Sequence, residues 1–69
     1  MNDFRQYWII KNEKDNYMFL NENSSPKFAK FSDLTAIYST KQKAIKFIIS
    51  RNLKDCEAKL IEINLDPYV

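Results

Sequence analysis

The chain has 69 residues, of which 45% are hydrophobic and 14% aromatic, and its net charge is +2. This size admits one folded domain, residues 1–69, and so small a charge neither demands a polyanionic partner nor allows the chain to mimic one. Histidine and glycine are both absent, which excludes the commonest general base and metal ligand as well as the usual phosphate-binding loops.

A β-hairpin is predicted near the beginning of the chain. The run Arg5 to Asn12 is aromatic and β-branched and is too short for a helix. The polar cluster Asn12–Asn16 follows, and Asn and Asp replace the missing glycines because they tolerate positive φ angles. The sequence Tyr17–Leu20 is then the returning strand.

The middle of the chain has a weaker pattern. Asn21–Pro26 is typical of a loop. Lys27–Leu34 stays open between helix, strand and loop, although its apolar residues have helical spacing. Ala36–Tyr38 is predicted to be a short strand or an extended segment that leads into a helix.

One amphipathic helix is predicted from Lys41 to Arg51. Ser39 and Gln42 form a capping-box pattern, and Thr40 is a rival N-cap. Asn52 replaces glycine as a left-handed C-cap. At 100° per residue the apolar side chains fall on one broad arc, formed by Ala44, Ile45, Phe47, Ile48 and Ile49.

The last predicted element is a half-buried strand from Ala58 to Leu65, after a polar turn at Leu53–Glu57. Apolar and polar residues alternate in it, and Asp66-Pro67 ends it because proline cannot donate to a ladder. The order is β-β-(β)-α-β. It predicts a small α+β domain, in which one amphipathic helix packs on one face of an antiparallel sheet.

The polar residues predict no catalytic, metal or cofactor site. Cys56 lies between Asp55 and Glu57, whose negative charges disfavour the thiolate. The serines at 24 and 25 have no histidine to activate them. A single cysteine fits a reducing compartment, and no apolar run approaches the roughly 20 residues that span a bilayer. The sequence therefore predicts a cytoplasmic protein that is not an enzyme.

The hairpin strands are apolar on both sides, because successive strand residues point to opposite faces. Tyr7 and Trp8 therefore project to different sides. In the returning strand, Tyr17 and Phe19 project to one side and Met18 and Leu20 to the other. A single helix covers one face only. The other face needs the Lys27–Leu34 segment, a second copy of the chain or another protein.

Basic residues gather in the first half of the helix, where the macrodipole favours negative charge instead. Lys41, Lys43 and Lys46 form either a patch that faces an acidic protein or a phosphate backbone, or an ordinary solvated helix face. The predicted partner-binding residues are Tyr7, Trp8, Tyr17, Phe19, Lys41, Lys43 and Lys46.

The layout of the chain resembles short accessory proteins encoded by phages and prophages of low-GC Gram-positive bacteria. The resemblance is carried by Tyr7–Asn12, Tyr17–Leu20, Ser39–Ala44 with the preceding Ala36–Tyr38, and Leu60–Ile63. It implies a stoichiometric inhibitor of a host enzyme, such as a nuclease of a bacterial immune system. No residue role comes with it.

Two functions follow as predictions. The first is a non-enzymatic, anti-CRISPR-like module that binds a host protein, either a nuclease or a nucleoprotein complex, as a monomer or a homodimer. The alternative is a small nucleic-acid-binding protein that uses the Lys-rich helix and the Tyr/Trp side chains. A ribonuclease built on Lys and Tyr is disfavoured, because acid–base catalysis by these groups needs deep burial.

Overall fold

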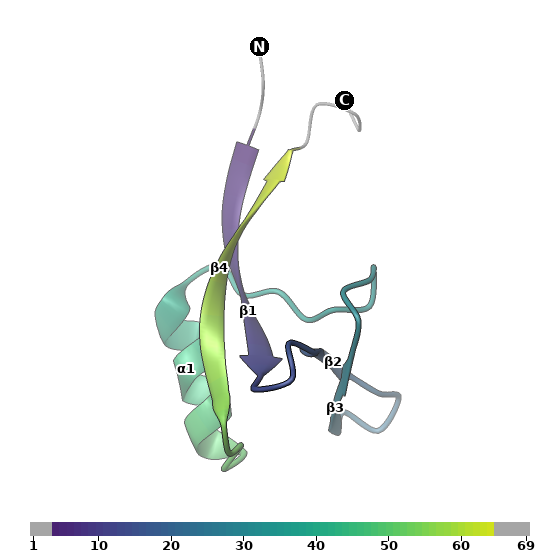
Figure 1. The fold of residues 1–69 in the computed structure, drawn as a ribbon. Coiled ribbons are helices and arrows are strands. Elements are labelled where there is room, and N and C mark those ends of the chain that lie inside the picture. The colour runs from purple at the N-terminus through teal and green to yellow at the C-terminus, as the bar shows by residue number, and fades with distance from the viewer. Residues whose placement is uncertain (1–3, 65–69) are drawn as a thin grey trace.

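The computed structural model describes residues 4–64, in which the chain forms four strands and one helix (Figure 1). The strands form one antiparallel sheet in the order β3-β2-β1-β4. This confirms the predicted α+β class with one helix on one face. The elements are β1 (Phe4–Asn12), β2 (Tyr17–Leu20), β3 (Pro26–Ala29), α1 (Lys41–Ser50) and β4 (Cys56–Asn64).

The longest ladder joins β1 to β4 and runs from the pair Phe4 and Asn64 to the pair Asn12 and Cys56. The prediction that the last strand begins at Ala58 is therefore wrong by two residues. Glu57 lies in the strand because it pairs with Lys11, whose Nζ lies 3.2 Å from the Glu57 carboxylate. The predicted strand end at residues 65–67 lies outside the described residues.

The third strand is β3. Its first residue, Pro26, is predicted to lie in a loop, and the sequence leaves the structure of Lys27–Leu34 open between helix, strand and loop. Met18 pairs with Phe28, and Phe28 packs half-buried against the core. Lys27 and Ala29 alternate with it and are exposed. Residues 27–29 are thus strand, and the rest of the segment is irregular; the helical alternative is wrong, because burial alternates with period two.

Both hairpin turns are closed by an asparagine side chain. Asn12 Oδ1 accepts hydrogen bonds from the N–H groups of Lys14 and Asn16, at 3.0 and 2.9 Å. In the second turn, Asn21 Oδ1 accepts hydrogen bonds from the N–H groups of Asn23 and Ser25, both at 2.9 Å. The fourth residue of each turn, Asp15 or Ser24, has a positive φ. Asn and Asp occupy three of the four positive-φ positions in residues 4–64, which supports the predicted replacement of glycine.

The helix α1 is capped at both ends by its own sequence. Thr40 is the N-cap and accepts from the Lys43 N–H through Oγ1 at 3.2 Å, so the rival N-cap, not Ser39, is the observed one. At the other end Asn52 has a φ of 52°, as predicted. Asn52 N–H bonds to Ile49 C=O and Leu53 N–H to Ile48 C=O, which is a Schellman motif.

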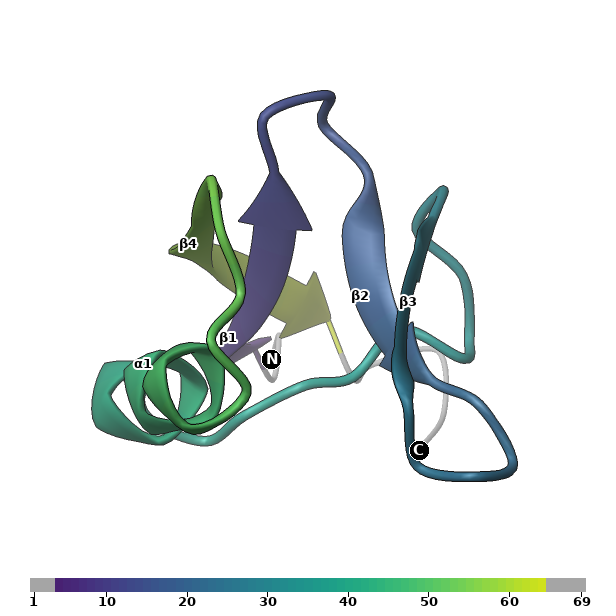
Figure 2. The same cartoon turned by 90° about the horizontal axis from the view of Figure 1, so that it is seen from below.

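The segment between β3 and α1 enters the sheet between β1 and β2. These strands share one Cα pair, Lys11 with Tyr17, and then spread apart (Figure 2). Trp8 and Tyr38 exchange two backbone hydrogen bonds of 2.8 Å, and Ala36 N–H donates to Met18 C=O at 2.9 Å. The predicted extended segment Ala36–Tyr38 is therefore confirmed, as a bridge between the two strands.

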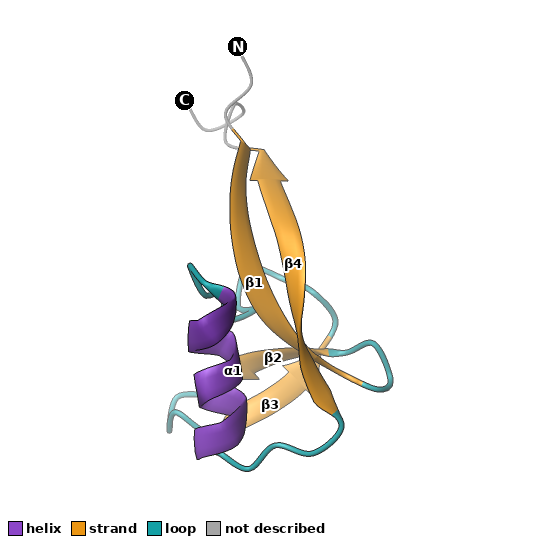
Figure 3. Cartoon of the chain, turned by 90° about the vertical axis from the view of Figure 1, so that its left-hand side faces the viewer, coloured by secondary structure: helices purple, strands orange, loops and turns teal. Residues whose placement is uncertain are grey.

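The core lies between the sheet and α1, which occupies one side of the β1–β4 ribbon (Figure 3). We call this side of the sheet the inner face. Ile10, Met18 and Ala44 are completely buried there. We call the opposite side the outer face. Strand alternation and the cross-strand pairs place Lys11, Glu57 and Lys59 on it, together with Thr35 and the following apolar residues: Tyr7, Ile9, Tyr17, Phe19, Ile37, Ile61 and Ile63.

The turn scheme is testable by removing one side-chain acceptor. Asn12→Ala deletes two hydrogen bonds to backbone N–H groups and should lower the free energy of unfolding by about 1 kcal/mol. Asn12→Asp keeps the acceptor oxygens and should stay closer to the wild type. Urea unfolding measures both variants, and equal losses for Ala and Asp would contradict the role of the acceptor.

Candidate protein-binding surface

The structure divides the seven predicted binding residues between the two faces. Trp8 lies on the inner face, where Lys41 Nζ stands 5.5 Å from its ring centroid. Tyr7, Tyr17 and Phe19 lie on the outer face. The seven residues therefore do not share one surface, and Tyr7 and Trp8 point to opposite faces as their adjacent positions in one strand require.

The basic side chains of α1 contact neighbouring groups of the same chain. Lys43 Nζ donates to Ser39 Oγ at 3.1 Å. The Arg51 guanidinium lies 5.2 Å from the Phe47 ring centroid. Lys46 is exposed. Lys41 and Arg51 thus lie over aromatic rings, Lys43 bonds a serine hydroxyl and Lys46 faces water, so three of these four basic side chains have partners within the chain.

The outer face is apolar but only partly covered. Ile9 is 1% exposed, whereas Tyr7, Tyr17 and Phe19 are half-buried. Phe31 packs edge-on against Tyr17, with ring centroids 5.9 Å apart and an interplanar angle of 86°. Part of the Lys27–Leu34 segment therefore covers this face. This is one of the three covers that the sequence allows, beside a second copy of the chain and another protein.

A tight turn positions the rest of this cover. The Ser32 N–H donates to Thr35 Oγ1 at 3.0 Å, and the Leu34 N–H donates to Ser32 Oγ at 3.1 Å. Thr35 is 8% exposed, while Leu34 is 73% exposed. The turn thus buries its last residue against β2 and holds an apolar side chain in solvent.

Beside this turn lies a hollow of about 310 Å³. Phe31 and Ile37, which line it, are 52% and 46% exposed. Neither residue is among the predicted binding residues. Alternation in Thr35–Tyr38, which turns Ile37 toward the outer face, is a local signal for Ile37. No local signal places Phe31 there. The lining residues are Phe31, Ser32, Asp33, Thr35, Ile37 and Ile63.

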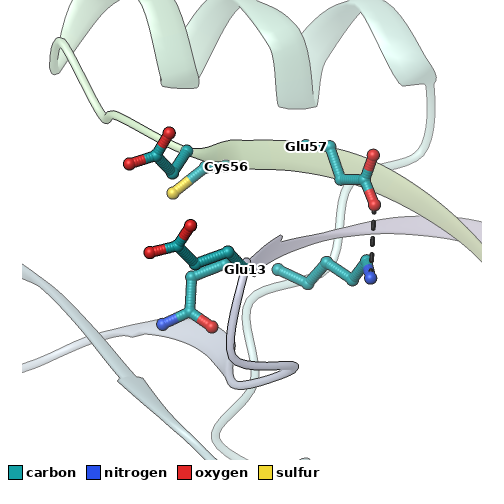
Figure 4. Close-up of a pocket in the computed structure, with 6 residues that line it drawn as sticks. Glu13, Cys56 and Glu57 are labelled. Carbon is teal, nitrogen blue, oxygen red and sulfur yellow. Dashed lines mark ion pairs between the residues drawn. The ribbon is translucent and has the colours of Figure 1, made fainter.

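A second hollow, of about 290 Å³, lies where β1 ends and β4 begins (Figure 4). Glu13 and Cys56 face each other across it, whereas Glu57 points away toward an ammonium group. That group is Lys11 Nζ, which also lies 2.9 Å from Asp15 Oδ1. Lys11 holds the pKa of Asp15 below its usual value, and the two carboxylates raise the pKa of Lys11.

The Cys56 thiol at this second hollow is not activated. Burial, and then the charge of Asp55, raise the pKa of the Cys56 thiol, so the thiolate is disfavoured at neutral pH. Among residues 4–64 no three His, Cys, Asp or Glu side chains converge to hold a metal ion. No buried side-chain nitrogen or oxygen in the described part of the chain lacks a hydrogen-bond partner.

Comparison of the chain with protein-family models, curated proteins and solved structures found no match. In the described part of the chain, α1 is too short and too polar to cross a membrane.

The inertness of Cys56 is testable by its rate of alkylation. Asp55→Asn removes the negative charge, and Asn also tolerates the φ of 57° at this position. The pKa of Cys56 should fall, and the alkylation rate at pH 8 should rise by less than about tenfold, because burial is the larger cause of the shift. Asp33→Asn is the control. An unchanged rate in Asp55→Asn would contradict this account.

Proposed function

We propose that this chain is a non-enzymatic module that binds a protein partner through its outer face. The observation that carries the proposal is the hollow whose apolar lining residues are Phe31, Ile37 and Ile63, with Phe31 and Ile37 about half exposed. Clustered apolar side chains around a concave surface are typical of protein interfaces.

The size of the molecule favours a stoichiometric role. A standard interface takes about 800 Å² from each partner. The accessible surface of the chain is 5385 Å², so one such interface would occupy about a seventh of it. A small protein that commits this much surface to one contact is suited to blocking or redirecting its partner.

The resemblance to phage and prophage accessory proteins extends this proposal to a host protein in the bacterial cytoplasm, such as a defence nuclease. This extension is supported by the layout of the sequence alone. The alternative, nucleic-acid binding through Lys41, Lys43, Lys46 and the aromatic residues, stays a prediction. Trp8, a ring expected to stack on bases, is half-buried beneath Lys41, which weighs against it.

The experiment compares lysine substitutions at three exposed apolar positions, of which Leu34 and Ile49 are equally exposed. Leu34 beside the hollow is 73% exposed, and Ile49 on α1 is 72% exposed. Leu34→Lys and Ile37→Lys should each reduce capture of a stoichiometric partner from nuclease-treated bacterial lysates at least tenfold, because they place a charge on the contact surface. Ile49→Lys should capture as much as the wild type.

Two outcomes would contradict the proposal. Equal capture by Leu34→Lys, Ile37→Lys and the wild type would exclude the outer face as the contact surface. Capture that occurs in untreated lysates and is absent from nuclease-treated ones would favour the nucleic-acid alternative. Circular dichroism of each variant separates a lost contact from a lost fold.

A further inference from the structure

The strand β4 is the last strand of the sheet on one side (Figure 3). Within residues 4–64 no strand pairs with its outer edge. The edge is nine residues long, from Cys56 to Asn64. A long edge strand is a template for pairing with another strand, unless its side chains oppose that pairing.

The backbone groups that face this edge can be identified from β1. Trp8 directs both its N–H and its C=O to Tyr38, away from β4. Its partner in the ladder is Leu60, so the two form a non-hydrogen-bonded pair. The N–H and C=O of Leu60 therefore point away from β1, toward the free edge of β4. Alternation then gives Cys56 and Ala58 the same orientation. These three residues present donors and acceptors to the edge.

The charged side chains along this stretch are complementary to those of a second, antiparallel copy of the same strand. Glu57 and Lys59 flank Ala58 symmetrically, and both belong to the outer side of the sheet. In an antiparallel pair centred on Ala58, each Glu57 lies opposite the partner's Lys59. The twofold axis produces this contact twice, and opposite charges across a ladder are stabilising.

We propose that two copies of this chain pair through β4, antiparallel, with Ala58 opposite Ala58 of the partner subunit. Antiparallel registers centred on other residues of β4 lose this match of opposite charges. Centring the pair on Glu57 or on Lys59 places like charges opposite each other. Centring it on Leu60 places Lys59 opposite the partner's Ile61. The charge pattern therefore selects both the occupant and the register.

On the inner side of the proposed pair, Cys56 lies opposite the partner's Leu60, and Leu60 is 45% exposed in the single chain. On the outer side, Glu57 lies 3.2 Å from Lys11 of β1, and Lys59 Nζ lies 5.7 Å from the ring centroid of Tyr17 in β2. Both charged side chains are therefore directed across β1 in the single chain. Pairing requires them to turn toward the free edge, where each Glu57 carboxylate meets the partner's Lys59.

The twofold axis stands perpendicular to the sheet, so the two outer faces lie on the same side of the dimer. The dimer would thus present two copies of the candidate protein-binding surface in one direction. This inference does not depend on the proposed function, because pairing needs no other partner. The pairing stretch is short, and we expect the dimer to form at high concentration and to weaken with added salt.

Charge reversal tests the pairing. Glu57→Lys and Lys59→Glu should each abolish the concentration-dependent rise in mass from 8.3 kDa toward twice that value in sedimentation equilibrium. The double variant should restore it, because the charges again match. Glu22→Lys and Lys14→Glu carry the same charge changes on exposed turns and should dimerise like the wild type.

Several outcomes would overturn the proposal. These are a wild-type chain that stays monomeric at every concentration, single variants that still dimerise, or a double variant that does not recover. Thermal unfolding of each variant identifies any loss of dimer that comes from loss of fold. A heterologous strand as the true occupant of the edge would appear as a monomeric wild type.

A disulfide tests the register independently. Hydrogen-bonded antiparallel pairs have Cα atoms about 5.5 Å apart, within the range for a disulfide. Leu60→Cys should therefore cross-link to the native Cys56 of the partner subunit under mild oxidation and give a dimer on a non-reducing gel. The variant that also carries Cys56→Ser should not cross-link. A bond between two introduced cysteines at position 60 would overturn the register.

Discussion

Two consecutive isoleucines of β1 must be buried on opposite faces of the same sheet. Ile9 is 1% exposed and Ile10 is 0% exposed. The helix α1 covers the inner face, where Ile10 packs with Met18 and Ala44. The outer face is covered from within the chain by the segment between β3 and α1, with Phe31 placed against Tyr17. Because this segment crosses from one face of the sheet to the other, one chain can bury both Ile9 and Ile10.

The insertion of Thr35–Tyr38 between β1 and β2 follows from the same constraint. Ala36 and Tyr38 turn to the inner core, while Thr35 and Ile37 turn to the outer face. One short segment therefore contributes to both covers. Ile37 is still 46% exposed, and this incomplete cover is the origin of the apolar hollow that we propose as a contact surface.

Local signals predict much of this fold. The hairpin, the helix, Asn52 and the extended segment at Ala36–Tyr38 follow from side-chain chemistry and periodicity. A strand at β3 stayed one of three open alternatives because four residues with one half-buried aromatic have no clear period, and their pairing with β2 depends on the Asn21 turn. The spread of β1 from β2 is a tertiary feature that no local pattern encodes. The contact of Phe31 with Tyr17 is likewise tertiary, so the candidate hollow was not predicted, although alternation is a local signal for Ile37.

The most direct test of the double burial compares Ile9→Val with Ile10→Val in urea unfolding. Each substitution removes one methylene-sized group from a packed position and should lower the free energy of unfolding by about 0.5–1.5 kcal/mol. Valine keeps the strand preference, so packing is the main difference. A loss at Ile10 with no measurable loss at Ile9 would show that the outer cover is not packed, and would contradict the account.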